Sequence, residues 1–202
     1  MIDKTIPFLE KNDKLICFGD SLTAATDSYV NFLQAALPQN EVVKAGRGGD
    51  KTTWALTRFE QDVLSQNPQA VSIALGTNDA AVGRGIWADE PSISPEAYRC
   101  NLVWMAHLCH LRGIRKISIA TPFGFEGRAF ADCGKRITDY ALAARDAADE
   151  MKAYLVPLDH LWVELRNGVP ESRMMLTRDG IHPLTHCYEA IAEACLAAWN
   201  MK

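Results

Sequence analysis

A serine near the start of the chain and an aspartate–histidine pair near its end have the residue types of a nucleophilic hydrolase. Ser21 lies in a Gly-Asp-Ser-Leu turn, whereas Asp179 and His182 lie in an Asp-Gly-Ile-His turn. A serine hydroxyl becomes a nucleophile when an imidazole takes its proton, and a carboxylate fixes the tautomer of that imidazole. We therefore predict Ser21 as the nucleophile, His182 as the base and Asp179 as the residue that orients the base.

Apolar segments typical of strands alternate with helical patterns along the chain. The expected strands are 15–18, 41–45, 70–75, 116–120 and 154–158, and the expected helices between them are 29–36, 52–65, 95–112 and 131–153. Strands separated by helices pair in parallel through right-handed crossovers. The pattern therefore predicts an α/β fold, a three-layer α/β/α sandwich formed by one domain over residues 1–202.

Each polar motif follows the carboxyl end of a predicted strand. Ser21 follows the first strand, a glycine-rich loop at 46–50 follows the second, and Asn78 follows the third; the 179–182 turn comes between the fifth strand and the last helix. Ligands of open parallel sheets bind beyond the carboxyl ends of the strands. We therefore expect these loops to meet at one rim of the sheet.

The four motifs, in this order, resemble those of the SGNH hydrolase family, which comprises GDSL-type esterases, lipases and acylhydrolases. They extend from the first predicted strand to the last turn and so cover most of the chain. The resemblance implies a flavodoxin-like, five-stranded parallel sheet of order 2-1-3-4-5, hydrolysis of carboxylic esters and no cofactor. It also implies that Ser21 is the nucleophile, that His182 is the base with Asp179 behind it, and that Gly49 and Asn78 are hydrogen-bond donors.

These donors fit the chemistry of ester cleavage. Attack on the carbonyl carbon creates a tetrahedral oxyanion, and losing one fixed donor to that oxygen costs about 2.7 to 4 kcal/mol. The expected oxyanion hole consists of the backbone amides of Ser21 and Gly49 and the side-chain amide of Asn78. Glycine suits the second position because it has no Cβ to obstruct the substrate.

The glycine-rich loop departs from the family pattern at two positions. Lys44 stands where family members often have asparagine, and Lys51 interrupts the Asp-Thr-Thr sequence that usually follows the loop. A shifted register would make Gly48 the donor instead of Gly49. Asp50, directly after Gly49, favours Gly49.

The composition favours a small-molecule substrate over a macromolecular partner. The 202 residues have a net charge of −4 and are 48% apolar, and Lys and Arg form no cluster that would bind nucleic acid. The first residues are too charged for a signal peptide, and no apolar stretch is long enough to span a bilayer. We therefore expect a cytoplasmic enzyme that acts on a small-molecule ester, with its oligomeric state left open.

The cysteines and histidines do not indicate a metal or a disulfide framework. The six cysteines form no Cys-x-x-Cys pair and lie mostly in apolar segments, so we expect buried, reduced thiols. His107 and His110 flank Cys109 without an acidic ligand nearby. His182 and His186 are four residues apart, but the start of the last helix lies between them. We therefore predict no metal.

Two other functional classes fit parts of this pattern. A glycine-rich loop that follows a strand and opens a helix is typical of a phosphate site, but the carboxylate of Asp50 would repel the anion. A non-catalytic module could bind a ligand at the same rim, and each polar turn taken alone could simply cap a helix. The joint presence of a nucleophile, a base, an orienting carboxylate and donors favours the hydrolase.

The residues of the predicted rim loops bear on the choice of substrate. Four arginines lie in or beside the predicted rim loops and no long apolar lid is visible; they are Arg47, Arg84, Arg128 and Arg178. We therefore expect short, acetyl-like acyl groups on a polar or carbohydrate-like alcohol, with a lysophospholipase- or thioesterase-type acylhydrolase as the alternative. The segment 80–93 is longer than a simple connection, and we interpret it as a loop that shapes the substrate site.

Overall fold

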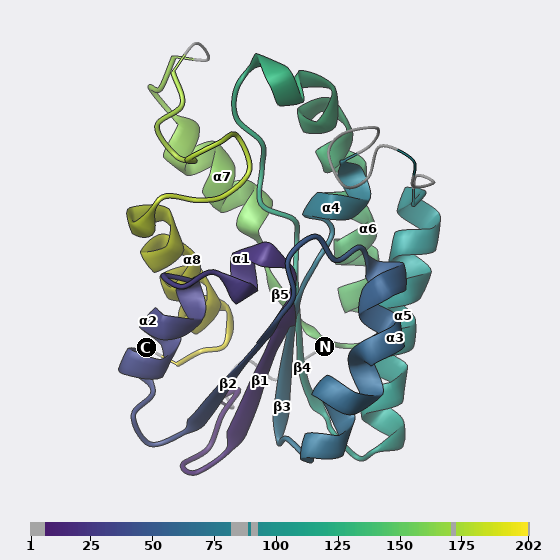
Figure 1. The fold of residues 1–202 in the computed structure, drawn as a ribbon. Helices are drawn as coiled ribbons and strands as arrows, with labels where there is room; N and C mark the ends of the chain where they lie inside the picture. Colours follow the sequence, from purple (N-terminus) through teal and green to yellow (C-terminus); the bar gives the residue numbers. More distant parts are fainter. Residues whose placement is uncertain (1–6, 82–88, 90–92, 171–172, 202) are drawn as a thin grey trace.

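Five parallel strands form the sheet on which the rest of the chain is arranged (Figure 1). The computed structural model describes all residues except 1–6, 82–88, 90–92, 171–172 and 202. The strands are β1 (Lys14–Gly19), β2 (Glu41–Gly46), β3 (Ala70–Ala74), β4 (Lys116–Ala120) and β5 (Tyr154–Val156). Their order is β2-β1-β3-β4-β5, with every neighbouring pair parallel, which confirms the predicted topology.

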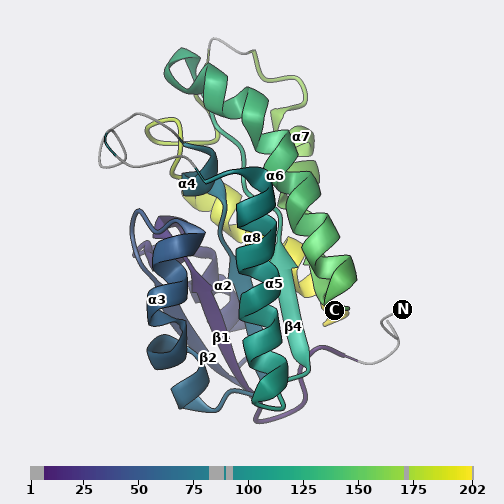
Figure 2. The ribbon, with the colours of Figure 1, turned by 90° about the vertical axis from the view of Figure 1, so that its right-hand side faces the viewer.

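Helices cover both faces of the sheet, as Figures 1 and 2 show. One face is covered by α2 (Tyr29–Ala36), α7 (Leu158–Arg166) and α8 (Thr185–Ala198). The other is covered by α3 (Thr52–Asp62), α5 (Pro95–Leu111) and α6 (Ala131–Glu150). Two one-turn helices, α1 (Ser21–Ala24) and α4 (Thr77–Ala80), follow β1 and β3 directly, and 3₁₀ turns span Leu64–Gln66 and Arg128–Phe130. The predicted three-layer sandwich is confirmed.

The interior strand β1 contributes to both halves of the hydrophobic core. Ile16 and Phe18 pack into the core under α3, α5 and α6, while Leu15 and Cys17 pack into the core under α2, α7 and α8. Successive side chains of a strand point to opposite faces, and a strand covered on both faces needs apolar residues at every position. This burial explains why the strand is continuously apolar from Leu15 to Phe18.

The sequence pattern predicted α5 correctly but did not predict α7. The predicted helix 95–112 is confirmed as α5: the Ser94 hydroxyl accepts a hydrogen bond from the amide of Ala97 (3.1 Å), and Gly113 at φ +77° follows the helix. The predicted strand 154–158 is wrong in its second half, since β5 ends at Val156 and α7 begins at Leu158. Four apolar residues of α7 recur with a helical period and pack against the core on the α8 side: Leu158, Leu161, Trp162 and Leu165.

The cysteines agree with most of the expectation. All six are free, and five are buried, whereas Cys100 is exposed on α5. Burial raises the pKa of the Cys195 thiol to about 12, so this sulfur stays protonated. Within the part of the chain that the structure describes, no helix has both the length and the apolar character needed to cross a membrane.

Candidate active site

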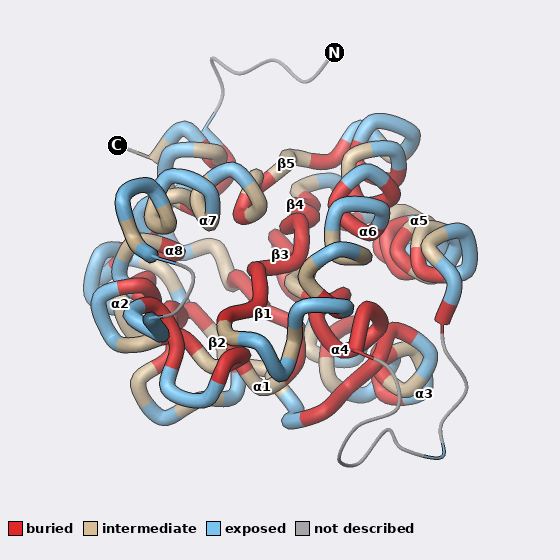
Figure 3. The backbone as a smooth tube through the Cα atoms, turned by 90° about the horizontal axis from the view of Figure 1, so that it is seen from above, coloured by how far each residue is buried: buried red, intermediate tan, exposed pale blue. Residues whose placement is uncertain are grey.

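The polar turns lie together beyond the carboxyl ends of the strands, the end that faces the viewer in Figure 3. A hydrogen bond from the Arg47 amide ties the loop after β2 to the end of β1. Asn78, on the turn after β3, donates from Nδ2 to the carbonyl of Asp50 at 2.9 Å. The turn at 179–182 contacts Ser21. The structure therefore brings the four predicted loops to one rim.

Ser21, His182 and Asp179 form a continuous chain of hydrogen bonds. The distance from His182 Nε2 to Ser21 Oγ is 3.0 Å, although the two residues are 161 positions apart in the sequence. His182 Nδ1 lies 2.7 Å from Asp179 Oδ2. With the Nδ1 proton donated to the carboxylate, Nε2 has its lone pair directed at the serine hydroxyl. This is the geometry that activates a serine nucleophile.

The Asp179 turn is held in shape by its own side chain. Asp179 Oδ1 accepts hydrogen bonds from the amides of Ile181 (3.0 Å) and His182 (2.9 Å), which leaves Oδ2 for the imidazole. Partial burial raises the pKa of the Asp179 carboxyl, but the hydrogen bonds from the His182 amide and ring and from the Ile181 amide outweigh it and lower the pKa below its ordinary value. Asp179 is therefore a carboxylate at neutral pH.

Gly180 makes this turn possible. Its φ of +98° lies in the left-handed region, and a Cβ there would lie 2.7 Å from the backbone oxygen of Glu126 and 2.6 Å from the ring of Phe130. A larger residue would push the turn away from the β4–α6 connection. The geometry between Asp179 and His182 thus depends on a glycine between them.

Ser21 is presented by a sharp turn from β1 into α1. Asp20 caps α1, since its Oδ1 accepts a hydrogen bond from the Leu22 amide at 2.9 Å. A Cβ on Gly19 would lie 2.1 Å from Thr23 Oγ1, so only glycine allows the helix to start this close to the strand. The hydroxyl of Ser21 consequently lies at the rim, whereas Asp20 is buried beneath it.

The predicted donors lie beside the serine. A Cβ on Gly48 would come 4.0 Å from Ser21 Cβ, so the loop passes directly next to the nucleophile. Gly49 has a φ of +80°, which glycine adopts without strain. Asn78 is buried, and its Nδ2 lies 3.4 Å from Asp20 Oδ2 in addition to its hydrogen bond with the loop. Ser21, the glycine loop and Asn78 thus occupy one site.

A buried arginine that no sequence motif marks supports the glycine loop from below. Arg58 Nε donates to Asp50 Oδ2 at 2.6 Å, and other nitrogens of the same guanidinium donate to the carbonyls of Gly19 (2.8 Å) and Ala45 (3.2 Å). The guanidinium also lies 4.2 Å from the centre of the Phe18 ring. Asp50 is therefore neutralised inside the protein, and Arg58 fixes the loop relative to the strand that carries the nucleophile.

A second buried carboxylate, Asp79, fixes the start of α3. It accepts hydrogen bonds from the hydroxyl of Thr52 at 2.5 Å and from the amide of Thr52 at 3.1 Å. Burial raises the pKa of Asp79 to about 6, although these hydrogen bonds and the charge of buried Lys51 oppose the shift. Both lysines that depart from the family pattern therefore have structural roles. The charge of Lys51 favours the ionised form of Asp79. Lys44 Nζ donates a hydrogen bond to the carbonyl of Ala25, just after α1 (2.9 Å).

Sequence comparison finds relatives of this chain among known proteins. The chain is 26% identical over 212 residues to acetylxylan esterase from Geobacillus stearothermophilus, covering 91% of this chain and 92% of that protein. It is 34% identical over 116 residues to the uncharacterized lipoprotein YqeF of Bacillus subtilis (strain 168), covering 52% of this chain and 46% of the lipoprotein. The chain thus matches less than half the length of the lipoprotein.

Solved structures show the same fold, and a family model covers most of the chain. The crystal structure of LAE5, an alpha/beta hydrolase enzyme from the metagenome of Lake Arreo, Spain, has a TM-score of 0.86 at 22% identity, over 97% of this chain and 99% of that chain. The model of the GDSL-like lipase/acylhydrolase family matches residues 17–190, which include Ser21, Asn78 and His182. The chain therefore belongs to the GDSL-like lipase/acylhydrolase family and is a carboxylic ester hydrolase.

Proposed function

We propose that this enzyme cleaves its ester through an acyl-enzyme intermediate on Ser21. The observation that carries the proposal is the hydrogen-bonded chain from Ser21 Oγ through both nitrogens of His182 to Asp179, with distances of 3.0 and 2.7 Å. Ser21 Oγ attacks the carbonyl carbon while His182 Nε2 takes the hydroxyl proton. The imidazolium then protonates the leaving alcohol, and water repeats both steps to release the acid.

The oxyanion is held, in this proposal, by the amides of Ser21 and Gly49 and by Asn78 Nδ2. One hydrogen of the Asn78 amide is directed to the Asp50 carbonyl at 2.9 Å. The second hydrogen makes a long hydrogen bond to Asp20 Oδ2 (3.4 Å), and the oxyanion would replace Asp20 as its acceptor. Gly48, which lies against Ser21, is the alternative backbone donor.

The preferred substrate is an ester of a short, acetyl-like acyl group with a polar or carbohydrate-like alcohol. The similarity to an acetylxylan esterase over nine-tenths of the chain supports this choice. A pocket of about 280 Å³ lies beside the glycine loop and is lined by Arg47, Gly48, Asp50, Trp54 and Thr57. An aromatic face and a guanidinium suit a hydroxyl-rich alcohol better than an acyl chain.

The other arginines predicted near the rim contribute less to this choice. Arg178 forms an ion pair with Asp27, and Arg128 is exposed on the β4–α6 connection. Arg84 and most of the segment 80–93 lie outside the described residues. The interpretation of that segment as a substrate-shaping loop stays a prediction.

Two measurements test the proposal. A serine-directed fluorophosphonate should label the wild-type protein at Ser21, found by peptide mass analysis, and should not label Ser21→Ala. Initial rates on esters of increasing acyl length, measured beside acetylated sugars, should be highest for the acetyl group. Rates that rise steadily with acyl length would favour a lysophospholipase- or thioesterase-type enzyme, and an unlabelled, inactive wild type would favour a binding module.

A further inference from the structure

A buried carboxylate stands behind the turn that carries Asp179 and His182. Glu126 belongs to the connection between β4 and α6, and its side chain is 0% exposed. Its position in the sequence gives no sign of function, since it lies far before Asp179 in a segment without a polar motif. It contacts the chain just before the catalytic turn.

Every described hydrogen bond of the Glu126 carboxylate is one that it accepts. Oε2 accepts from the amides of Leu176 (3.0 Å) and Thr177 (2.8 Å) and from the Thr177 hydroxyl (2.8 Å). Oε1 accepts from the amide of Met175 (2.9 Å) and from Arg166 (2.7 Å). One carboxylate therefore accepts hydrogen bonds from three consecutive backbone amides and holds them close together.

Further hydrogen bonds connect Glu126 and Thr177 to the catalytic turn. The Thr177 hydroxyl accepts a hydrogen bond from the Gly180 amide at 3.1 Å. The backbone amide of Glu126 donates to the carbonyl of Gly180 at 2.8 Å. The amide of Arg178 donates to the carbonyl of His182 at 2.8 Å, which closes the turn. Glu126 thus holds Gly180, the glycine between Asp179 and His182, directly through its backbone and indirectly through Thr177.

The charge of Glu126 is required for this arrangement. Burial alone would raise its pKa, but the hydrogen bonds from Met175, Leu176 and Thr177 outweigh burial and lower the pKa below its ordinary value. The guanidinium of Arg166 balances the charge. A neutral amide at this position would direct its N–H groups at other donors and leave backbone amides without a partner.

We propose that Glu126 is a positioning residue for the catalytic turn. It holds Asp179 and His182 at the position where His182 Nε2 lies within hydrogen-bond distance of Ser21 Oγ. The proposal rests on the proposed function, since it assumes that these three residues carry out the reaction. Glu126 is buried behind the turn and acts only through it. A displacement of about 1 Å in a catalytic group costs about 10²-fold in rate, so the placement of this turn has a large effect.

The test is Glu126→Gln, which keeps the shape of the side chain but has one acceptor oxygen instead of two. We expect kcat to fall about 10²-fold with little change in KM, because the reacting groups are displaced and the substrate contacts are not. The strongly deshielded proton NMR signal of the Nδ1–H bond between His182 and Asp179 should broaden or disappear. Both are measured at a temperature where circular dichroism shows the variant folded.

A second variant and a control keep the test decisive if Glu126→Gln does not fold. Thr177→Val removes the hydroxyl that links Glu126 to Gly180 but keeps the ion pair with Arg166, and kcat should fall about tenfold, since one hydrogen bond of a larger set is lost. Asp13→Asn changes a carboxylate paired with Lys116 at the other end of the sheet. This control should keep both the NMR signal and kcat.

The outcomes separate this proposal from the proposed function. If Ser21→Ala retains activity, the proposed function itself is wrong. If the wild type is active, Ser21→Ala is inactive, and folded Glu126→Gln has the kcat and the NMR signal of the wild type, only the role of Glu126 is overturned. A raised KM with unchanged kcat and an intact NMR signal would also overturn it, because the effect would then lie in substrate binding.

Discussion

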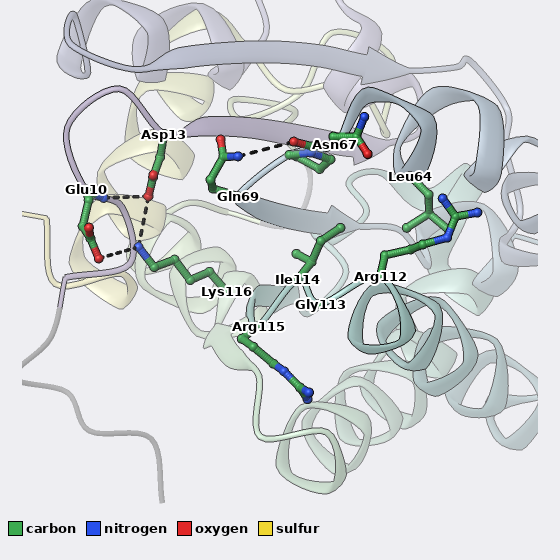
Figure 4. A pocket seen from close by; sticks show the side chains of 11 residues that line it. Glu10, Asp13, Leu64, Asn67, Gln69, Arg112, Gly113, Ile114, Arg115 and Lys116 are labelled. Carbon is green, nitrogen blue, oxygen red and sulfur yellow. Dashed lines mark hydrogen bonds and ion pairs between the residues drawn. The ribbon is translucent and has the colours of Figure 1, made fainter.

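Both ends of the parallel sheet carry polar side chains, but the residue types and their arrangement differ. At the carboxyl end, a hydroxyl and an imidazole meet at 3.0 Å. At the amino end, a pocket of about 510 Å³ is lined by both acidic and basic side chains, among them Asp13 and Lys116 (Figure 4). Lys116 Nζ forms ion pairs with Asp13 (3.0 Å) and Glu10 (3.2 Å). The residues that line this pocket include no serine, cysteine or histidine.

The comparison of the two ends shows that the size of a pocket does not identify the candidate active site of this molecule. The amino-end pocket is larger than the 280 Å³ pocket beside the glycine loop, yet its two carboxylates, Asp13 and Glu10, are both paired with Lys116. At the carboxyl end, Asp179 instead orients an imidazole whose other nitrogen faces a hydroxyl. In the proposed mechanism, the reactive end is the one at which a base is directed at a nucleophile rather than at an opposite charge.

The largest effect is expected from Ser21→Ala and His182→Ala. Each removes a group that forms or breaks a bond, so kcat for a small activated ester should fall about 10⁶-fold. The measurement is steady-state hydrolysis, with circular dichroism to show that the fold is intact. Turnover near the wild-type value in Ser21→Ala would contradict the assignment of the carboxyl end as the reactive one.

Asn78→Ala should have the second-largest effect. Loss of one oxyanion donor lowers kcat about 10²- to 10³-fold. Asn101→Ala is the matched control, because Asn101 Nδ2 donates to Thr52 Oγ1 (2.9 Å) and not to the glycine loop. Steady-state kinetics should show a loss of less than about tenfold for the control. Equal losses in the two variants would mean that Asn78 acts only through packing.

Asp20→Asn tests the carboxyl end of the sheet through the pH dependence of the protein's thermal stability. Burial raises the pKa of Asp20 to about 7, partly opposed by the Leu22 amide, and an unfolded aspartate has a pKa of about 3.9. The stabilisation from the protonated form is therefore complete below about pH 4 and is lost as the pH rises toward 7. Thermal unfolding from pH 4 to 8 should show the wild type losing about 5 to 10 °C relative to Asp20→Asn.

A difference in melting temperature that stays constant between pH 4 and 8 would contradict that prediction, because it would mean that Asp20 ionises as easily in the folded state as in the unfolded state. Asp79, which is also buried, contributes to the raised pKa of Asp20, so the comparison reports the ionisation of Asp20 in the presence of this neighbour.

The smallest effect is expected at the amino end. Asp13→Asn breaks an ion pair with Lys116 that lies at the edge of the pocket in Figure 4. Such a pair contributes about 1 kcal/mol or less, so urea unfolding should show a small loss and kcat/KM should change by less than about twofold. A large loss of activity in a folded variant would show that the two ends of the sheet are coupled.

The fold could be predicted from the sequence more completely than the buried contacts that hold the candidate active site in place. The apolar strands and the capped start of α5 follow from short-range patterns, whereas α7 was missed because its first residue, Leu158, continues the apolar stretch of β5. Ser21, Asp179 and His182 were found because each lies in a short, polar turn. Arg58 and Glu126 lie in no such turn, and nothing in the residues around them indicates a partner 8 or 49 to 51 positions away.

The sequence by itself determined most of the strands and helices, though not α7, and it determined which side chains could serve as nucleophile, base and donor. These features depend on local periodicity and on residue chemistry. Only the tertiary structure decided that His182 faces Ser21, that Arg58 neutralises Asp50, and that Glu126 gathers the amides before the catalytic turn. Those contacts join residues far apart in the chain, and their geometry arises from how the packed sheet and helices place the loops, which no local pattern encodes.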